Sequence, residues 1–428
     1  MQLLFIAFHF PPQGGAGVQR ALKFVKYLPE FGIMPTILTT DHIPKSRWTP
    51  PDKTLMEEVP PQIKVIRTAW PVTRKRIDRC VADPLIQNQL SSLGPFDSLL
   101  VSASPFSDIS LAQYLSDKLR IPWFADLRDP WALDEFQVRL TRWHRAGLKR
   151  KMGKSLSGAS RIIMNTPEAS CVAREAFPNF EKDKIFHVTN GFDGLEFKQN
   201  QNKKQSNVFK IVHSGSLQTH LGLQQKKRKL EYAILGRTIK GMRSLSRSHF
   251  YLLAAIKQMC EKRPNLRQEI KLVLAGLLHQ TDFEIIRKFD LSDVVETPGY
   301  LTHGESINLI SGADLLFLPM HTLVNGQRAT IVPGKTYEYM ATGRPILAAV
   351  PDGDAKDFLK QCGTAFISDP DDVESITRIL LKRYSSWKNN TPNPPANWKF
   401  IRQFERRNLA GKLADILKGC DNRSHAVP

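Results

Sequence analysis

Residues 332–347, VPGKTYEYMATGRPIL, contain the residue types that would hold a diphosphate. A Pro-Gly turn leads into a predicted short helix that has Lys335 in its first turn and Glu338 three residues later. The first N–H groups of a helix have no partner within it and lie at the positive end of its dipole. The corner at Gly334 is therefore suited to phosphate, and Glu338 to hydroxyls attached to that phosphate. This is the chemistry of a nucleotide-sugar diphosphate.

A second glycine-rich corner lies near the start of the chain, in the segment FHFPPQGGAGVQR. A predicted strand ends there, two prolines follow, and Gly14, Gly15 and Gly17 precede a predicted helix. Glycines allow the backbone to approach a ligand closely and leave the helix N–H groups accessible. The pattern is not the dinucleotide fingerprint, because GGAG lacks GxGxxG spacing. Two interpretations of this segment therefore stay open: a flexible turn and a ligand-binding loop.

The segment ADLRDPW places Asp126, Arg128 and Asp129 at the end of another predicted strand. In one interpretation the arginine and the carboxylates form a structural network that fixes the loop. In the other, these residues are catalytic. We recognise no nucleophilic triad, and no DxD-type metal pair flanked by strand signals stands out. Lysine, arginine and a helix dipole would then stabilise the diphosphate in place of a metal.

These motifs need a scaffold that brings strand ends together, and the sequence predicts one. Short apolar runs alternate with helical periodicity, which is typical of a parallel sheet covered by helices. Helices are expected over residues 16–31 and 400–417. Strands are expected at residues 3–9, 35–39, 64–67, 98–102, 123–126, 161–165, 185–189, 209–213, 270–275, 294–297, 315–318 and 346–349.

The chain has 428 residues, more than the ~250–300 residues of a single core, so two domains are expected. The first would cover residues 1–195 and the second 208–395, with a polar linker over 196–207 and a C-terminal helix and tail over 396–428. A basic segment at about 218–246 is expected to be an insertion in the second domain. Ligands would bind at the carboxyl ends of both sheets.

Five segments, taken together, resemble bacterial family-4-like glycosyltransferases. They are FHFPPQGGAGVQRALKFVKYLPEFG, IPWFADLRDPWA, VTNGFD, HSGSL and PGKTYEYMATGRPIL, in family order and spread over nearly the whole chain. The resemblance implies an α/β protein with the GT-B fold, in which two Rossmann-like doubly wound domains face each other across a cleft. The N-terminal domain would receive the acceptor, and the C-terminal domain would bind the nucleotide sugar.

The resemblance also implies the composition of the donor site. The loop at Gly14, Gly15 and Gly17 would face the sugar phosphate. The C-terminal domain would contribute the following residues to the donor site: Ser214, Gly215, Arg247, Gly299, Tyr300, Thr330, Gly334, Lys335 and Glu338.

Within that set, the resemblance implies specific contacts. Backbone groups at Ser214 and Gly215, with the charge of Lys335, would bind the diphosphate. Backbone at Gly299 and Tyr300 would read the base. The second basic residue is expected to be Arg247, with Arg237 and Lys240 as alternatives.

Thr330 is a departure from the family pattern. Glu338 matches the second acid of a Glu-x7-Glu motif and would hold the ribose. Thr330 stands where the first acid normally contacts the sugar. The resemblance further implies retention of anomeric configuration without a metal, and no cofactor besides the donor.

A net charge of +20 calls for an anionic partner. Between residues 139 and 154 seven basic residues occur without an acid, and Trp143 lies among them. A basic amphipathic helix with a tryptophan suits an anionic membrane surface, and a solvated helix face is the alternative. The residues of this expected membrane or acceptor surface are Arg139, Arg142, Arg145, Lys149 and Arg150, and a second basic cluster lies at Arg74, Lys75, Arg76 and Arg79.

We therefore expect a lipid-linked or envelope glycan acceptor at the inner face of the cytoplasmic membrane. The five scattered cysteines favour a reducing cytoplasm. The apolar N-terminus is expected to be a buried strand and not a signal peptide. His9, His213 and His303 are expected to be structural or hydrogen-bonding residues. A protein of this kind would be cytoplasmic and peripheral at the membrane.

Three other functions stay open. The first is a GT-B sugar-nucleotide epimerase, and the second is an inactive transferase, because of Thr330 and the insertion. The third is a non-catalytic protein that binds an anionic surface or nucleic acid. We expect no nucleic acid partner, because the basic clusters contain few aromatic residues.

Overall fold

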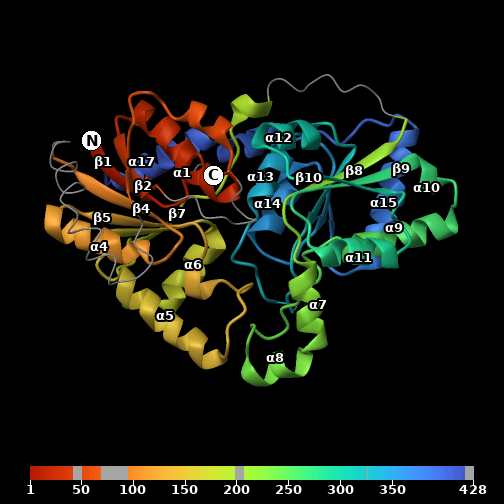
Figure 1. Ribbon diagram of the computed structural model, residues 1–428, viewed down its shortest axis with the longest axis horizontal. Coiled ribbons are helices and arrows are strands. Elements are labelled where there is room, and N and C mark those ends of the chain that lie inside the picture. The colour runs from red at the N-terminus through yellow and green to blue at the C-terminus, as the bar shows by residue number, and fades with distance from the viewer. Residues whose placement is uncertain (42–50, 69–94, 198–206, 325, 420–428) are drawn as a thin grey trace. The chain divides into compact units, whose positions relative to one another are not determined.

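The computed structural model describes residues 1–41, 51–68, 95–197, 207–324 and 326–419, and they form two compact units (Figure 1). Unit 1 comprises Met1–Asp134, Ala146–Asn190 and Phe404–Pro428, as far as these are described. Unit 2 comprises Glu135–Arg145 and Gly191–Gln403. Most of the expected linker, and the basic cluster at residues 74–79, lie outside the described residues.

Unit 1 is built on a sheet of seven parallel strands in the order β3-β2-β1-β4-β5-β6-β7. The strands are β1 (Gln2–Ala7), β2 (Met34–Thr40), β3 (Lys64–Thr68), β4 (Ser98–Ala103), β5 (Trp123–Leu127), β6 (Arg161–Met164) and β7 (Ile185–His187). Side chains alternate between two cores: Leu4 and Ile6 belong to one, and Leu3 and Phe5 to the other. Burial on both faces explains why β1 reads as a continuous apolar run.

The sheet of unit 2 has six parallel strands in the order β10-β9-β8-β11-β12-β13. They are β8 (Phe209–Ser214), β9 (Ile270–Ala275), β10 (Val295–Gly299), β11 (Leu315–Pro319), β12 (Ile346–Ala349) and β13 (Ala365–Ser368). The expected strands are confirmed, and β13 was missed because this four-residue strand is only partly buried and lacks a continuous apolar run. Two Rossmann-like doubly wound domains are therefore present, as predicted.

The helices of unit 1 are α1 (Ala16–Tyr27), α4 (Asp108–Leu119), α5 (Arg142–Leu156), α6 (Pro167–Ala176) and α17 (Arg406–Leu417), with the first turn of α5 belonging to unit 2. The helices of unit 2 are α7 (Thr219–Lys227), α8 (Lys229–Leu235), α9 (Phe250–Lys262), α10 (Leu266–Glu269), α11 (Gln280–Lys288), α12 (His303–Ser311), α13 (Gly334–Ala341), α14 (Asp354–Cys362), α15 (Val373–Lys388) and α16 (Trp398–Ile401). The basic segment at 218–246 forms α7, α8 and the loop after them.

Three details differ from the sequence prediction. The first helix ends at Tyr27 and continues as a 3₁₀ turn over Leu28–Phe31, because Pro29 lacks the N–H that an α-helix needs. The C-terminal helix is divided into α16, a 3₁₀ turn and α17, and α17 packs on α1 in unit 1. Residues 135–145 pack in unit 2 although they lie in the N-terminal half of the sequence.

Candidate functional site

The candidate site in unit 2 lies where β8 ends, at the point where the sheet order reverses between β8 and β11. Open parallel sheets bind ligands at this position. Helix α13 begins there after Pro333, and its first turn has no side-chain cap and no acidic residue. A Cβ atom added at Gly334 would have no atom within 4 Å. The start of α13 is therefore accessible to an anion.

Lys335 lies directly against the end of β8. Its Nζ is 3.1 Å from Nε2 of His213. A Cβ atom at Gly215 would lie 2.8 Å from the same Nζ, and Gly215 has a φ of 114°. Only glycine meets both conditions without strain. The HSG and PGK motifs, 120 residues apart in sequence (335 − 215 = 120), thus form one corner.

The tautomer of His213 follows from its partners. Its Nδ1 is 3.0 Å from the carbonyl oxygen of Phe317, which can only accept, so Nδ1 carries the proton. Nε2 then accepts from the Lys335 ammonium. Burial, followed by the charge of Lys335, keeps the pKa of His213 well below its ordinary value. The imidazole is therefore neutral and orients the lysine, as expected for a hydrogen-bonding histidine.

Burial lowers the pKa of Lys335 to about 7, with a further decrease from the charge of Arg247 and a partial offset from Glu338. Two cations thus lie close enough to oppose each other's charge. A diphosphate bound there would be attracted to both positive charges and would reduce the repulsion between them. Glu338 is partly buried one helical turn beyond Lys335, where the sequence prediction placed it.

Arg247 precedes α9, and its guanidinium lies over the ring of Phe136 at 4.7 Å from the centroid. Of the three basic residues that the sequence left open, Arg247 is the one that acts on Lys335. Arg237 instead bonds to Glu231 at 2.5 Å, and Lys240 is exposed. A cation over an aromatic face is held in a preferred orientation.

Thr330 lies beside a carboxylate from elsewhere in the sequence. The backbone N–H of Thr330 donates to Oε1 of Glu135 at 3.1 Å, and its hydroxyl donates to Oε2. His321 Nε2 is 3.2 Å from Oε1 of the same residue. Burial alone would raise the pKa of Glu135, but the hydrogen bonds and charge from His321 and Thr330 bring it below its ordinary value. An ionised carboxylate therefore lies against the position where the sequence lacks an acid.

The backbone at the end of β8 is engaged within the domain. The N–H of Ser214 donates to the Tyr339 hydroxyl at 3.0 Å, and the N–H of Gly215 donates to the Ala275 carbonyl at 2.8 Å. The Ser214 hydroxyl lies 2.7 Å from that of Ser306. The expected backbone contacts to a diphosphate at these two residues stay a prediction.

Gly299 is the last residue of β10 and Tyr300 follows it, at the carboxyl end of the sheet. The Gly299 carbonyl accepts from the N–H of Gly276 at 2.7 Å, and a Cβ atom added at Gly299 would have no atom within 4 Å. Both residues are partly exposed. Their expected contact with a base stays a prediction.

In unit 1, the glycine corner meets the RDP segment. Arg128 donates from Nη1 to the carbonyl of Gly17 at 2.5 Å, and a Cβ atom at Gly17 would lie 2.8 Å from the same nitrogen. Gly15 precedes α1 with a φ of 86°, and Gly14 is buried. Burial, followed by the charge of Arg128, lowers the pKa of His9 to about 4.

Asp126 occupies a different environment from the rest of its triplet. It is completely buried, and its two oxygens accept from Nη2 and Nε of Arg20 at 2.6 and 2.8 Å. This geometry favours the structural network among the two interpretations of Asp126. Asp129 is exposed and Arg128 is partly buried, so these two are the more accessible members of the expected catalytic set.

The residues expected at a membrane or acceptor surface lie before and along α5. Arg142, Lys149 and Arg150 are exposed, while Arg139 and Arg145 are partly buried. Within the described part of the chain, no helix combines the length and apolarity needed to cross a bilayer.

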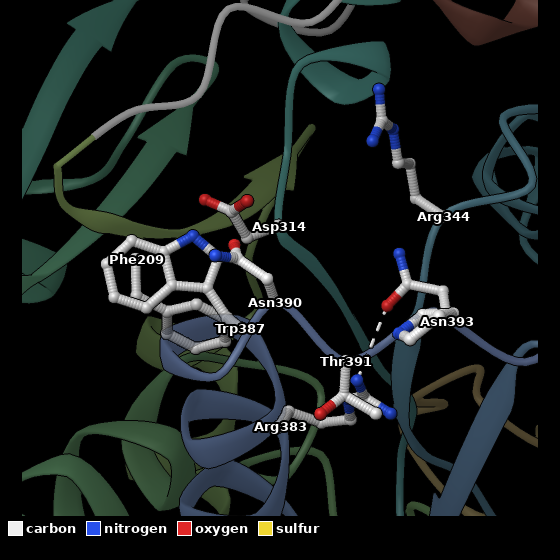
Figure 2. Close-up of a pocket in the computed structure, with 9 residues that line it drawn as sticks. Phe209, Asp314, Arg344, Arg383, Trp387, Asn390, Thr391 and Asn393 are labelled. Atoms are coloured by element: carbon white, nitrogen blue, oxygen red, sulfur yellow. Dashed lines mark hydrogen bonds between the residues drawn. The ribbon is translucent and has the colours of Figure 1, made fainter.

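A cavity of about 230 Å³ lies at the other end of the strands of the unit 2 sheet, away from Lys335 (Figure 2). Phe209 at the start of β8 and Asp314 just before β11 contribute to its lining, and Arg383 bonds to Asn393 at 3.3 Å within it. Phe209 and Asp314 thus lie at the amino ends of β8 and β11. The cavity is therefore distinct from the site around Lys335.

Sequence reasoning missed Glu135, Phe136, His321 and Tyr339. Glu135 and Phe136 follow the RDPW motif directly, so their position next to a functional segment was an available signal. His321 and Tyr339 gave none, since a buried histidine or tyrosine is ordinarily a core residue.

Residues 243–393 match the model of a protein family described as glycosyl transferases group 1. No curated protein matches the chain. Among solved structures, the chain is similar to HepE of Anabaena in complex with UDP, with a TM-score of 0.62 and 16% identity over 98% of this chain and 100% of that one.

Two other solved structures are similar over nearly the same length. For the sucrose-phosphate synthase of Thermosynechococcus elongatus the TM-score is 0.61 and the identity 14%, over 98% of each chain. For the UDP-GlcNAc 2-epimerase of Methanocaldococcus jannaschii the TM-score is 0.57 and the identity 12%, over 98% of this chain and 100% of that one. At these identities the likeness establishes the fold alone.

The predicted GT-B fold is confirmed, and assignment to family 4 stays a prediction. The family match covers Arg247, Lys335 and Glu338, which the structure brings to one end of the unit 2 sheet. Residues 243–393 therefore match the glycosyl transferases group 1 family, within a chain that has the GT-B fold.

Proposed function

We propose that the protein transfers a sugar from a nucleotide-diphosphate donor to a hydroxyl acceptor, with retention of anomeric configuration and without a metal. The observation that carries this proposal is the pair of cations, Lys335 and Arg247, beside the start of α13 in the group 1 domain. The solved structures of HepE with UDP and UDP-glucose support a nucleotide sugar as the donor.

The chemical role of the pair follows from the charge that develops in the reaction. The bond between the anomeric carbon and the diphosphate breaks, and a bond from that carbon to the acceptor oxygen forms on the same face. The acceptor proton passes to an oxygen of the departing phosphate. Preorganised cations stabilise the negative charge of that leaving group in a way that solvent cannot. We propose that Lys335 and Arg247 do this.

The acceptor is proposed to be a lipid-linked or envelope glycan at the inner face of the cytoplasmic membrane. The excess of basic residues supports it, because an anionic leaflet attracts basic segments near its surface. The exposed residues Arg142, Lys149 and Arg150 would contribute to that attraction.

The test is a calorimetric titration of the wild-type protein with UDP, GDP and their sugar derivatives, followed by product analysis with donor and a glycan-lipid extract. We expect one nucleotide to bind, the sugar to appear on an acceptor, and a chelator to leave the rate unchanged. Absence of binding by every nucleotide would contradict the donor assignment. Loss of activity with chelator would contradict metal independence.

The same analysis with donor alone separates a transferase from an epimerase, the class to which the similar structure from Methanocaldococcus jannaschii belongs. An epimerase changes the sugar of its donor without an acceptor. Formation of a new nucleotide sugar under these conditions would therefore replace the proposal with the epimerase.

A further inference from the structure

Four large apolar side chains of unit 2 are mostly exposed and lie on two neighbouring segments. Leu230 and Ile234 of α8 are 75% and 64% exposed, and Leu140 and Trp143 are 64% and 76% exposed. Leu230 and Ile234 are four residues apart and therefore share one face of the helix. Exposure of this extent costs free energy in water, and apolar groups that gather on a surface commonly mark an interaction site.

Direct contacts join the two segments. The N–H of Arg139 donates to the carbonyl of Arg237 at 2.7 Å, and Nη2 of Arg145 donates to the same oxygen at 3.1 Å. A Cβ atom at Gly236 would lie 3.1 Å from Cβ of Arg142. Residues 139–145 and α8 therefore form one structural feature, which we call the tip, and Figure 1 shows α8 at the end of α7, away from the unit 2 sheet.

The face of α8 that points away from solvent is packed. Tyr232 of α8 is 7% exposed, and Arg237 lies over its ring at 4.8 Å from the centroid. Arg237 also bonds to Glu231 at 2.5 Å. With Tyr232 facing inward, the opposite part of this short helix faces solvent, and that part carries Leu230 and Ile234. The exposed apolar residues are thus presented by a helix whose opposite face is packed.

The charge around the tip has one sign. Lys226, Lys227, Arg228 and Lys229 are exposed at the junction of α7 and α8. Glu231 is the single acid between residues 218 and 249. It is bonded to two arginines, at 2.6 Å to Arg228 and 2.5 Å to Arg237. The apolar side chains therefore lie within a strongly basic surface.

We propose that the tip inserts into the interfacial layer of a bilayer that contains anionic lipids, with Leu140, Trp143, Leu230 and Ile234 below the headgroups and the lysines among them. This inference rests on the proposed membrane-linked acceptor and assigns a function to the basic insertion. Tryptophan prefers the boundary between headgroups and acyl chains, and basic residues beside apolar ones bind anionic leaflets. A nucleic acid partner would use the charges and leave the two aliphatic residues without a partner.

The test compares the wild-type protein, the variant Leu230→Ser/Ile234→Ser, and the control Leu195→Ser, which changes another exposed leucine of unit 2 outside the tip. The probes are vesicles of phosphatidylglycerol mixed with phosphatidylcholine and vesicles of phosphatidylcholine alone, with binding measured by co-sedimentation. We expect the wild type and the control to bind the anionic vesicles. The double variant should bind about tenfold or more weakly, because two exposed aliphatic side chains no longer enter the bilayer.

Salt separates insertion from charge attraction alone. Exposed charge interactions are screened at high ionic strength, whereas burial of apolar groups is not. The wild type should therefore keep a residual fraction on anionic vesicles at high salt, and the double variant, which retains only Leu140 and Trp143 of the four apolar side chains, should keep a clearly smaller one. Equal binding of both proteins under all conditions would overturn the proposal.

Further measurements on the same proteins complete the test. UDP affinity and the melting temperature should be unchanged in the double variant, since the substituted side chains are exposed and belong to no part of the donor site. A wild type that forms dimers which the double variant loses, without vesicle binding, would overturn the proposal in favour of a second copy of the chain. Failure of UDP to bind to the wild type would concern the proposed donor and leave the vesicle result intact.

Discussion

One buried and one partly buried basic residue show how this molecule uses charge differently in its two units. Arg20 of unit 1 is 2% exposed, and its guanidinium bonds to both oxygens of Asp126, to the carbonyls of Val188 and Thr189, and to the side chain of Asn190. Lys335 of unit 2 faces a neutral imidazole and a second cation, with Glu338 as a partial offset. The hydrogen-bond partners of Arg20 within the fold balance its charge, and those of Lys335 do not.

The difference distinguishes a structural charge from a binding charge. A buried ion pair costs much to break, because removing one partner leaves the other charge buried alone. A lysine whose pKa is lowered to about 7 lacks that compensation in the free protein. The lysine gains this compensating charge when an anion binds. The same burial that is unfavourable for the free lysine therefore favours the complex.

The largest expected effect comes from breaking the saturated pair. Arg20→Met would leave Asp126 ionised and buried, and we expect the free energy of unfolding to fall by about 3–5 kcal/mol. Urea denaturation would measure it. Arg20→Met/Asp126→Leu is the matched control, and it should recover part of the loss because neither charge remains. Unchanged stability in the single variant would contradict a structural role for the pair.

Lys335→Met should have the opposite pattern, with binding lost and stability kept. A charge-assisted hydrogen bond contributes about 1.5–3 kcal/mol, so UDP, or whichever nucleotide the wild type binds, should bind roughly 10- to 150-fold more weakly in calorimetry. The folded-state pKa of Lys335 lies below the unfolded value, so the protonated lysine destabilises the fold below pH 7 and the penalty is relieved as pH rises toward about 10.

The free energy of unfolding of Lys335→Met at neutral pH should therefore equal or exceed that of the wild type. The matched control for loss of a buried lysine is Lys23→Gln or Lys23→Met. Lys23 bonds to Glu58 at 2.5 Å in unit 1, and either control variant should leave nucleotide binding intact. A Lys335→Met protein that is much less stable and still binds nucleotide would reverse the assignment of the two regions.

The pH dependence of nucleotide affinity sharpens the same point. In the free protein Lys335 loses its proton above about pH 7, and a bound diphosphate raises that pKa. Affinity should therefore be constant at lower pH and weaken by up to about tenfold per unit as the pH rises above 7. In Lys335→Met this slope should be absent. An identical slope in both proteins would show that another group is responsible.

Much of this arrangement was predictable from local sequence. Apolar runs predicted the strands, and turn chemistry with helix polarity predicted the corner at Gly334 and Lys335. The partners of Arg20 and Thr330 were not predictable in this way. Arg20 and Asp126 are 106 residues apart, and Glu135 and Thr330 are 195 apart. The periodicity of a segment does not indicate which distant polar groups it will contact. Each buried polar group nevertheless needs a partner once the chain is folded.

The smallest expected effect concerns Thr330, whose hydroxyl donates to Glu135. Thr330→Val removes that donor and keeps the backbone N–H bond, so we expect a loss of about 1 kcal/mol in the free energy of unfolding. Thr330→Ser, which keeps the hydroxyl, is the matched control. Since Phe136 follows Glu135 and supports Arg247, a loosened Glu135 should also change nucleotide affinity, by less than Lys335→Met does. If Thr330→Val and Thr330→Ser are alike in both measurements, the hydroxyl bond contributes nothing, and Glu135 is held by His321 and the backbone.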